Sequence, residues 1–183
     1  NIAYIFNEGT RDLVPAFGEL KRFDVITGNK TVIMHLPHAN ISSAQVSADG
    51  QWLLFVSDVE TAPGKGSSQL QLVRMDGQGL QTLYCATLGT LTGVQWSPDQ
   101  KVVIFSSDQA NPGTPSLYLL ILATGTVQRE FSNVDINFDY VPMTWLDTAR
   151  LYLLKVPNST QMYTQGLSLL DTGKGADQHL SLI

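Results

Sequence analysis

The hydrophobic positions of this chain fall into short runs of four to eight residues that are separated by Gly, Pro, Asp and Ser. Helical spacing of apolar residues is nearly absent, and glycine or proline interrupts each stretch that could form a helix. Two runs, 53–56 and 102–105, are apolar at every position, which indicates strands that are buried on both faces. The pattern therefore predicts an all-β protein of short strands.

A repeat of about 50 residues runs along the chain. The segment 46–58, VSADGQWLLFVSD, matches the segment 96–108, WSPDQKVVIFSSD, with Ser, Asp, Phe, Ser and Asp at equivalent places. A degenerate copy begins 49 residues later at Trp145, and a partial copy occupies 3–8. These matches predict that one structural unit is used several times.

A second marker keeps the same period. Turn dipeptides that end in glycine stand at Thr27-Gly28, Asp76-Gly77, Thr124-Gly125 and Thr172-Gly173, with glycine spacings of 49, 48 and 48 residues. Each follows an apolar stretch, as expected for tight hairpins in which glycine adopts a positive φ. Two markers with one period divide the chain into units at 1–38, 39–87, 88–134 and 135–183.

Each unit is predicted to hold four short antiparallel strands. The expected strands are 43–47, 51–57, 69–75 and 80–85 in the second unit, 92–96, 101–106, 116–122 and 126–131 in the third, and 140–145, 150–155, 161–169 and 177–182 in the fourth. The first unit supplies 2–6, 19–26 and 30–35 and lacks the innermost strand. Four strands in ~45 residues are typical of a β-propeller blade. The prediction is a β-propeller of about four blades, or half of a propeller with six to eight.

The second and third units carry a family resemblance. Trp96-Ser97-Pro98-Asp99 and Phe105-Ser106-Ser107 resemble the WD-like repeat of Tol-system propellers, W-S-P-D-G-x-x-I-x-F-x-S, with Gln100 in place of the glycine. The resemblance covers roughly 41–155. The same repeat occurs in prolyl-oligopeptidase-type propellers and in bacterial sensor proteins, so it implies a fold that serves many functions.

The repeat also has a mechanical interpretation. Proline presets φ in the turn between the first and second strands, and the Asp carboxylate accepts the N–H groups of the turn. Trp96 and Trp145 are then expected to pack between blades. Cys85, which has no second cysteine to pair with, is expected to be a small buried apolar residue.

Composition narrows the classes of partner. Apolar residues make up 43% of the chain and charged residues 15%, which suits a folded core, and the net charge of −5 argues against nucleic-acid binding. No run reaches the ~18 apolar residues of a membrane span, and no signal segment is seen. Because the chain starts without Met, it is expected to be a processed or excised piece, with a periplasmic or extracellular location favoured.

Candidate binding residues lie in the loops between second and third strands. These loops are predicted at Asn7–Gly18, Asp58–Ser68, Asp108–Ser116 and Pro157–Thr160, on the face that the connections between blades also reach. Glu8, Asp58 and Asp108 stand at equivalent strand ends, where three carboxylates could hold a Ca²⁺ or a cationic ligand. The alternative is that each is a solvated acid that ends its strand.

No pattern of catalytic or metal-binding residues stands out in the sequence. His35 and His38 form H-x-x-H around Pro37, but zinc needs three or four ligands and no other Cys or His is near. The G-x-S-x-G and H-E-x-x-H motifs are missing from the sequence. We therefore predict no catalytic residues, no metal and no cofactor.

The function predicted is non-catalytic binding of a ligand or protein. The module could be the extracytoplasmic sensor of a larger signalling protein, such as a bacterial Ser/Thr kinase. One alternative is the propeller of a prolyl-oligopeptidase-type serine peptidase whose catalytic domain lies outside this chain, and another is a scaffold for a protein complex. Open blade edges invite pairing, so self-association to a dimer is expected.

Overall fold

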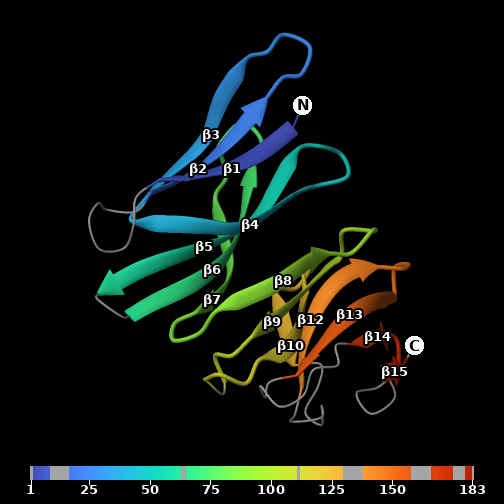
Figure 1. Cartoon of the computed structure of the whole chain (residues 1–183). Helices are drawn as coiled ribbons and strands as arrows, with labels where there is room; N and C mark the ends of the chain where they lie inside the picture. Colours follow the sequence, from blue (N-terminus) through green and yellow to red (C-terminus); the bar gives the residue numbers. More distant parts are fainter. Residues whose placement is uncertain are drawn as a thin grey trace. The chain divides into compact units, whose positions relative to one another are not determined.

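The computed structural model describes residues 2–8, 17–62, 65–110, 112–129, 138–157, 166–174 and 180–182. Every regular element among these residues is a β-strand, which confirms the all-β prediction (Figure 1). Among the described residues there is thus no helix that could cross a membrane. The chain divides into two compact units, unit 1 over 1–88 and unit 2 over 89–183, and each is described by itself.

Unit 1 holds two antiparallel sheets. Sheet A has the order β1 (Ile2–Glu8), β2 (Phe17–Phe23), β3 (Lys30–Pro37), and sheet B has the order β4 (Ala39–Val46), β5 (Trp52–Ala62), β6 (Lys65–Arg74), β7 (Gln81–Ala86). Consecutive strands pair throughout, as in a meander of hairpins. The core of this unit lies between the two sheets and consists of Leu20, Ile33, Ile41, Leu53, Phe55 and Val73.

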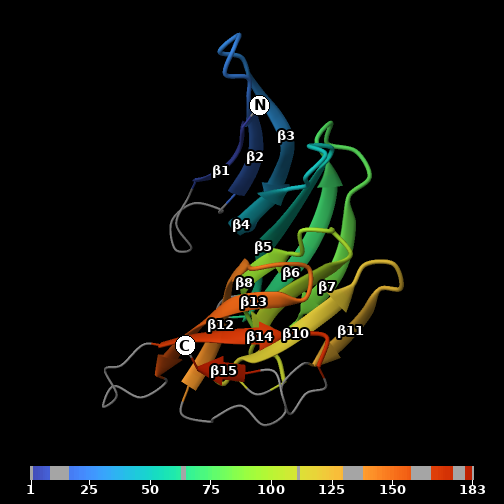
Figure 2. The same ribbon diagram turned by 90° about the vertical axis from the view of Figure 1, so that its right-hand side faces the viewer.

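Unit 2 also holds two antiparallel sheets, each of four strands (Figure 2). Sheet C consists of β8 (Leu91–Trp96), β9 (Val102–Ser107), β10 (Ser116–Ile121) and β11 (Thr126–Arg129), and sheet D of β12 (Phe138–Trp145), β13 (Arg150–Pro157), β14 (Gly166–Asp171) and β15 (Leu180–Leu182). Its core consists of Ile104, Leu117, Leu119, Tyr140, Leu151, Leu153 and Leu170. Trp145 packs against this core, as predicted, whereas Trp96 is half-buried and its packing role stays a prediction.

The apolar strands are buried on both faces, as their sequences predict. In β5, four successive residues from Leu53 to Val56 are at most 1% exposed, and in β9 the residues from Val103 to Phe105 are fully buried. Because successive side chains of a strand point to opposite faces, both faces of these central strands are covered. This is the burial that stacked sheets require.

The turns that join first to second strands in sheets B and C have the same polar framework. In sheet B, Ser47 Oγ donates to Asp49 and accepts the Trp52 N–H at 2.9 Å, while Asp49 accepts the Gln51 N–H at 3.0 Å. In sheet C, Ser97 and Asp99 make the equivalent contacts. The hydrogen bond from the serine hydroxyl is the main reason why the pKa of each aspartate lies below its ordinary value. The predicted role of the turn aspartate is therefore confirmed.

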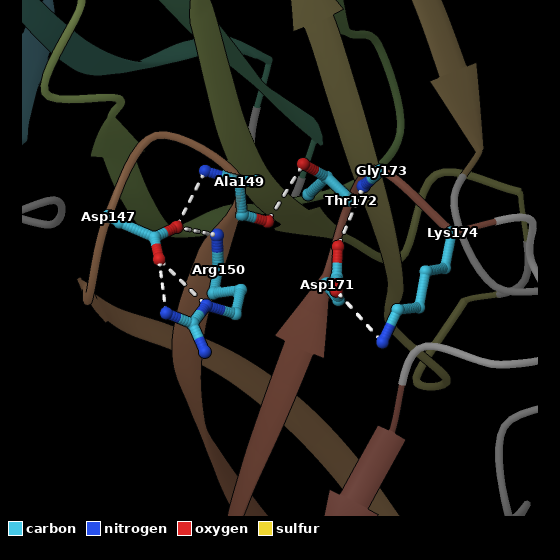
Figure 3. Close-up of polar contacts among 7 residues, drawn as sticks. All are labelled: Asp147, Ala149, Arg150, Asp171, Thr172, Gly173 and Lys174. Atoms are coloured by element: carbon cyan, nitrogen blue, oxygen red, sulfur yellow. Dashed lines mark hydrogen bonds and ion pairs between the residues drawn. The ribbon is translucent and has the colours of Figure 1, made fainter.

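Sheet D closes its equivalent turn differently (Figure 3). Asp147 accepts the N–H groups of Ala149 and Arg150 at 2.9 and 2.7 Å, and its second oxygen pairs with the Arg150 guanidinium. Thr172, in the next turn of the sheet, donates its N–H to the Ala149 carbonyl at 2.8 Å. Where the repeat is degenerate, an Asp–Arg pair thus replaces the serine hydroxyl. The link between the two turns is kept in all three sheets, since Met75 donates its N–H to the Gln51 carbonyl in sheet B and Leu122 to the Lys101 carbonyl in sheet C.

Three details correct the sequence analysis. The strand predicted over 19–26 ends at Phe23, because Asp24 accepts the N–H groups of Ile26 and Thr27 and turns the chain, leaving Ile26 92% exposed. Cys85 is exposed instead of buried, since it occupies a solvent-facing position of β7. Among the predicted turn glycines, Gly28, Gly77 and Gly125 have positive φ, while Gly173 donates its N–H to Asp171 instead.

Candidate binding surface

Asp108 connects three segments at the end of β9. Its Oδ1 accepts the Thr90 N–H at 2.7 Å and the Thr90 hydroxyl at 3.2 Å, and its Oδ2 accepts the Gly113 N–H at 3.3 Å. Partial burial raises the pKa of Asp108, but the hydrogen bonds from Thr90 and Gly113 outweigh it and hold the pKa below its ordinary value. The contact confirms that the connection entering β8 and the loop after β9 share one face.

Asp58 has a different setting. It lies within β5, opposite Ser68 of β6, and accepts a hydrogen bond from the Ser68 hydroxyl. The loop predicted over Asp58–Ser68 is wrong for most of its length, because β5 continues to Ala62 and β6 begins at Lys65. Polar residues such as Ser67 pair across the two strands and extend the ladder where the sequence suggests its end.

The three predicted carboxylates are not brought into one site by any contact that the structure describes. Asp58 belongs to unit 1 and Asp108 to unit 2, and each is hydrogen-bonded within its own sheet region. Glu8 lies in β1 opposite Phe17, and its side chain lies outside the described residues. A cation held by these residues therefore stays a prediction.

Unit 2 brings further polar groups to the face of Asp108. Gly93 of β8 approaches β12 so closely that a Cβ would lie 2.7 Å from Pro142 Cδ and 2.9 Å from Val141 Cγ1, so these two strands lie side by side near their middles. The beginnings of β8 and β12 and the ends of β9 and β13 form one edge, since β8 and β12 pair antiparallel with them. We call this edge the unit 2 rim; its residues are Thr90, Asp108, Gln109, Phe138, Asp139 and Lys155.

Two acceptors of the unit 2 rim are buried without a hydrogen-bond partner: Gln109 Oε1 and Asp139 Oδ1. Burial raises the pKa of Asp139, because the charged carboxylate loses hydration that no donor replaces. Neither residue was predicted from the sequence as a binding residue. The sequence does carry a signal for Asp139, because a polar residue recurs at this place in the repeat. Asn40 pairs with Asp58 in sheet B and Thr90 contacts Asp108 in sheet C, as Asp139 pairs with Val156 in sheet D.

The ammonium group of Lys155 packs over an aromatic ring at the same rim. Lys155 Nζ lies 3.8 Å from the centroid of the Phe138 ring and 5.9 Å from that of Tyr140. The aromatic rings fix the position of the ammonium at the end of β13. The unit 2 rim thus carries an unpartnered acceptor and a positioned positive charge on opposite faces of sheet D, because Asp139 alternates with Phe138 and Tyr140 along β12.

The remaining sequence candidates do not form a site among the described residues. His35 Nδ1 lies 3.4 Å from Glu19 Oε1, and the His35 ring packs on Phe17. No group of three or more His, Cys, Asp or Glu residues in the described ranges could hold a metal ion. His35 is therefore part of a surface polar cluster of sheet A.

Comparison with known proteins establishes the fold. No family model matches the chain, and no curated protein matches it. Among solved structures, TolB from Acinetobacter baumannii is similar with a TM-score of 0.67 and 19% identity over 98% of this chain and 39% of that one. Dipeptidyl peptidase 4 from Porphyromonas gingivalis gives 0.63 and 12% over 99% and 31%, and puromycin hydrolase gives 0.60 and 14% over 97% and 30%.

These likenesses show that the chain has a β-propeller fold built from four-stranded antiparallel sheets. The fold is that of Tol-type propellers and of the propeller domains of prolyl peptidases. The chain spans about a third of the length of these relatives, between 30% and 39% in the three cases above.

Proposed function

We propose that this propeller module binds polypeptide segments at the unit 2 rim without catalysing a reaction. The observation that carries the proposal is the pair of buried acceptors, Gln109 Oε1 and Asp139 Oδ1, that have no partner. A buried acceptor without a donor costs about 1–3 kcal/mol, and a ligand that supplies the donor recovers this free energy on binding. Backbone N–H groups and amino groups of peptides are such donors.

The structural relatives support this ligand class. Several are peptidases by name, including prolyl endopeptidases and dipeptidyl peptidase 4, and the chain matches them over 92% or more of its length. Lys155, positioned on Phe138 at the same edge but on the other face of sheet D, offers a separate donor for a peptide carbonyl or carboxylate. Within a longer protein, we propose that the module is the extracytoplasmic sensor of a signalling system.

The proposal is tested by isothermal titration of the 183-residue chain with a mixed library of free tripeptides. We expect weak binding that falls about tenfold in Asp139→Asn, since one lost hydrogen bond to a charged group has this effect. Asp171→Asn is the matched control, because Asp171 lies at the opposite end of β14 from the rim. Equal affinity in Asp139→Asn and the unsubstituted chain would exclude the rim as the binding site.

Binding should also depend on pH in a defined direction. A peptide donor favours the ionised form of Asp139, whose pKa is raised by burial. Affinity is therefore expected to fall as the pH drops through a range above the ordinary carboxyl pKa. In Asp139→Asn this pH dependence should vanish, which separates titration of the protein from titration of the peptide.

A second candidate function is the propeller of a serine peptidase whose catalytic domain lies outside this chain. The peptidase relatives favour it, because this chain covers only 21–31% of those proteins. The sequence of the full gene separates the two functions. An α/β-hydrolase segment with G-x-S-x-G would select the peptidase, and a kinase segment would select the sensor.

A further inference from the structure

Two serine hydroxyls are enclosed in the layer between sheets C and D without a hydrogen-bond partner. Ser106 of β9 is 1% exposed and Ser168 of β14 is 0% exposed, and neither Oγ atom has a partner. Ser106 lies directly opposite Leu117 of β10, and Ser168 lies opposite Leu153 of β13. Both leucines belong to the unit 2 core, which the two sheets share, so both hydroxyls face into this layer.

Both serines lie toward the end of the layer that carries the unit 2 rim. Ser106 is the last residue but one of β9, whose end is part of that rim. β14 begins beside the end of β13, since Gly166 pairs with Lys155, and Ser168 lies near that beginning. The opposite end of the layer is filled by apolar side chains such as Leu170. The layer therefore changes from apolar to polar toward the rim.

Sheet B shows how the same repeat satisfies its buried polar groups. Gln71 occupies the place of Ser168 in the register, because each lies opposite a core residue two positions after the residue that pairs with the end of the first strand. Gln71 Oε1 accepts the Ser57 hydroxyl at 2.7 Å, and its Nε2 donates to a threonine of β7 at 3.2 Å. Among the described residues of unit 1, no buried side-chain N or O atom lacks a partner.

Two replacements in the repeat explain why the hydroxyls of unit 2 are unpartnered. Lys155 takes the place of Ser57, but its ammonium lies 3.8 Å from the centroid of an aromatic ring of β12 and makes no hydrogen bond with Ser168. Ser106 takes the place of Val56, which stands 50 residues earlier and is 0% exposed. A hydroxyl therefore occupies a position where sheet B has an apolar side chain.

An unpartnered buried hydroxyl favours any state in which water reaches it. In the closed layer both hydroxyls have lost their water and gained no partner, whereas in a layer that is open at the rim each can bind water. The Ser57–Gln71 hydrogen bond of sheet B already satisfies its two groups, so hydration of that pair gains little. Opening is therefore favoured between sheets C and D relative to the corresponding layer of unit 1.

We propose that sheets C and D separate at their rim end within the folded protein, as a conformational switch that hydrates Ser106 and Ser168. The apolar end of the layer stays packed, and each sheet keeps its own hydrogen-bonded ladder. The opening uncovers the rings of Phe138 and Tyr140 on the inner face of sheet D, together with the ammonium of Lys155. This switch does not require the peptide binding proposed above, because it depends on the layer alone.

Labelling of introduced thiols measures the opening. In the full chain carrying Cys85→Ser, which removes the exposed native thiol, Ser168→Cys places a thiol inside the layer. The matched control is Ser57→Cys, because Ser57 is 1% exposed in sheet B. We expect dithiobis(nitrobenzoate) to react with the Ser168→Cys thiol about tenfold faster than with the control. Low urea should leave this rate unchanged, because a local opening exposes little surface.

Removal of the second hydroxyl tests its cause. In the Ser168→Cys protein, Ser106→Ala should slow labelling about fivefold, because the opening then hydrates one group fewer. If Ser106 only filled space, the loss of its Oγ would leave a void, loosen the layer and speed labelling. The direction of the change therefore separates an unpartnered hydroxyl from a packing residue.

Three results would overturn the proposal: equal labelling of the thiols at the two serine positions, a Ser168→Cys rate that rises with urea in step with unfolding, and a Ser106→Ala variant that labels as fast or faster. Circular dichroism establishes that each variant is folded. The reciprocal pair, Ser106→Cys with and without Ser168→Ala, repeats the test from sheet C and should give the same directions. Failure of peptide binding at the rim leaves all of these results unchanged.

Discussion

Sheets B and C are close copies in sequence, yet they use the same aspartate differently. In the turn between the first and second strands their hydrogen bonds correspond, and the second strands β5 and β9 are buried alike. At the end of that strand, Asp58 binds a serine of its own hairpin, whereas Asp108 binds the connection at Thr90 and the loop at Gly113. The shared turn and second strand form the sheet, whereas the contacts of the aspartate at the strand end determine which loops are held there.

The difference comes from the residues on the C-terminal side of each aspartate. After Asp58 the chain continues as paired strand to Ala62, so the carboxylate faces a cross-strand neighbour. After Asp108 the strand has already ended at Ser107, and the carboxylate is available to two loops. A repeated carboxylate is therefore no evidence of a repeated role.

The largest effect should come from the shared phenylalanine. Phe55 and Phe105 are 1% and 0% exposed, and Phe105 stacks on Tyr118 with centroids 5.7 Å apart. Replacing either by Ala should lower the free energy of unfolding by about 3–5 kcal/mol, measured by denaturant titration. A much smaller loss for one of them would show that the two sheets are equivalent in sequence but not in packing.

The aspartates should differ in the next largest effect. Asp108→Asn removes charge-assisted bonds that join two loops to β9, and about 1–2 kcal/mol of stability should be lost near neutral pH, reduced by the partial exposure of the group. Asp58→Asn weakens one hydroxyl contact and should cost about 0.5–1 kcal/mol. Equal losses would contradict the assignment of Asp108 to loop tethering.

The Asp108 variant also has a pH signature. Because the pKa of Asp108 is lower in the folded state than in the unfolded chain, its stabilisation is present above about pH 4 and is lost as the pH falls through the carboxyl range. Asp108→Asn should therefore lose less stability on acidification than the unsubstituted chain does. Thermal unfolding at neutral and acidic pH measures this difference.

The smallest effect concerns the turns. Gly50 has φ +71° and Gln100, at the equivalent place, has φ +59°. A side chain in this left-handed region costs roughly 1 kcal/mol, so Gln100→Gly should stabilise the protein by about that amount and Gly50→Gln should destabilise it equally. The two melting temperatures, shifting in opposite directions, check this prediction.

Much of the fold could be predicted because its causes are local. The period of the Ser-x-Asp turns and the fully apolar second strands identify the sheets directly. The end of β2 was missed because Val25 and Ile26 look like strand residues, while the Asp24 carboxylate that ends the strand acts through two hydrogen bonds. The extension of β5 to Ala62 depends on partners in β6, which a single strand does not reveal.

The candidate site was less predictable for a related reason. The rule that acids at matching strand ends gather on one rim led to Asp58 and Asp108, and their oxygens prove to be engaged within the fold. Gln109 Oε1 and Asp139 Oδ1 are distinguished by the lack of a hydrogen-bond donor near them. Whether a donor lies near a buried oxygen depends on tertiary packing, and no sequence motif indicates it.

The exposed Cys85 has a practical consequence. It is the sole thiol of the chain and lies on β7, the outermost strand of sheet B, with its side chain in solvent. A maleimide dye or spin label will therefore attach at one defined point without disturbing either core. Surface coupling through this atom would orient every immobilised molecule alike and leave the rim of unit 2 unmodified.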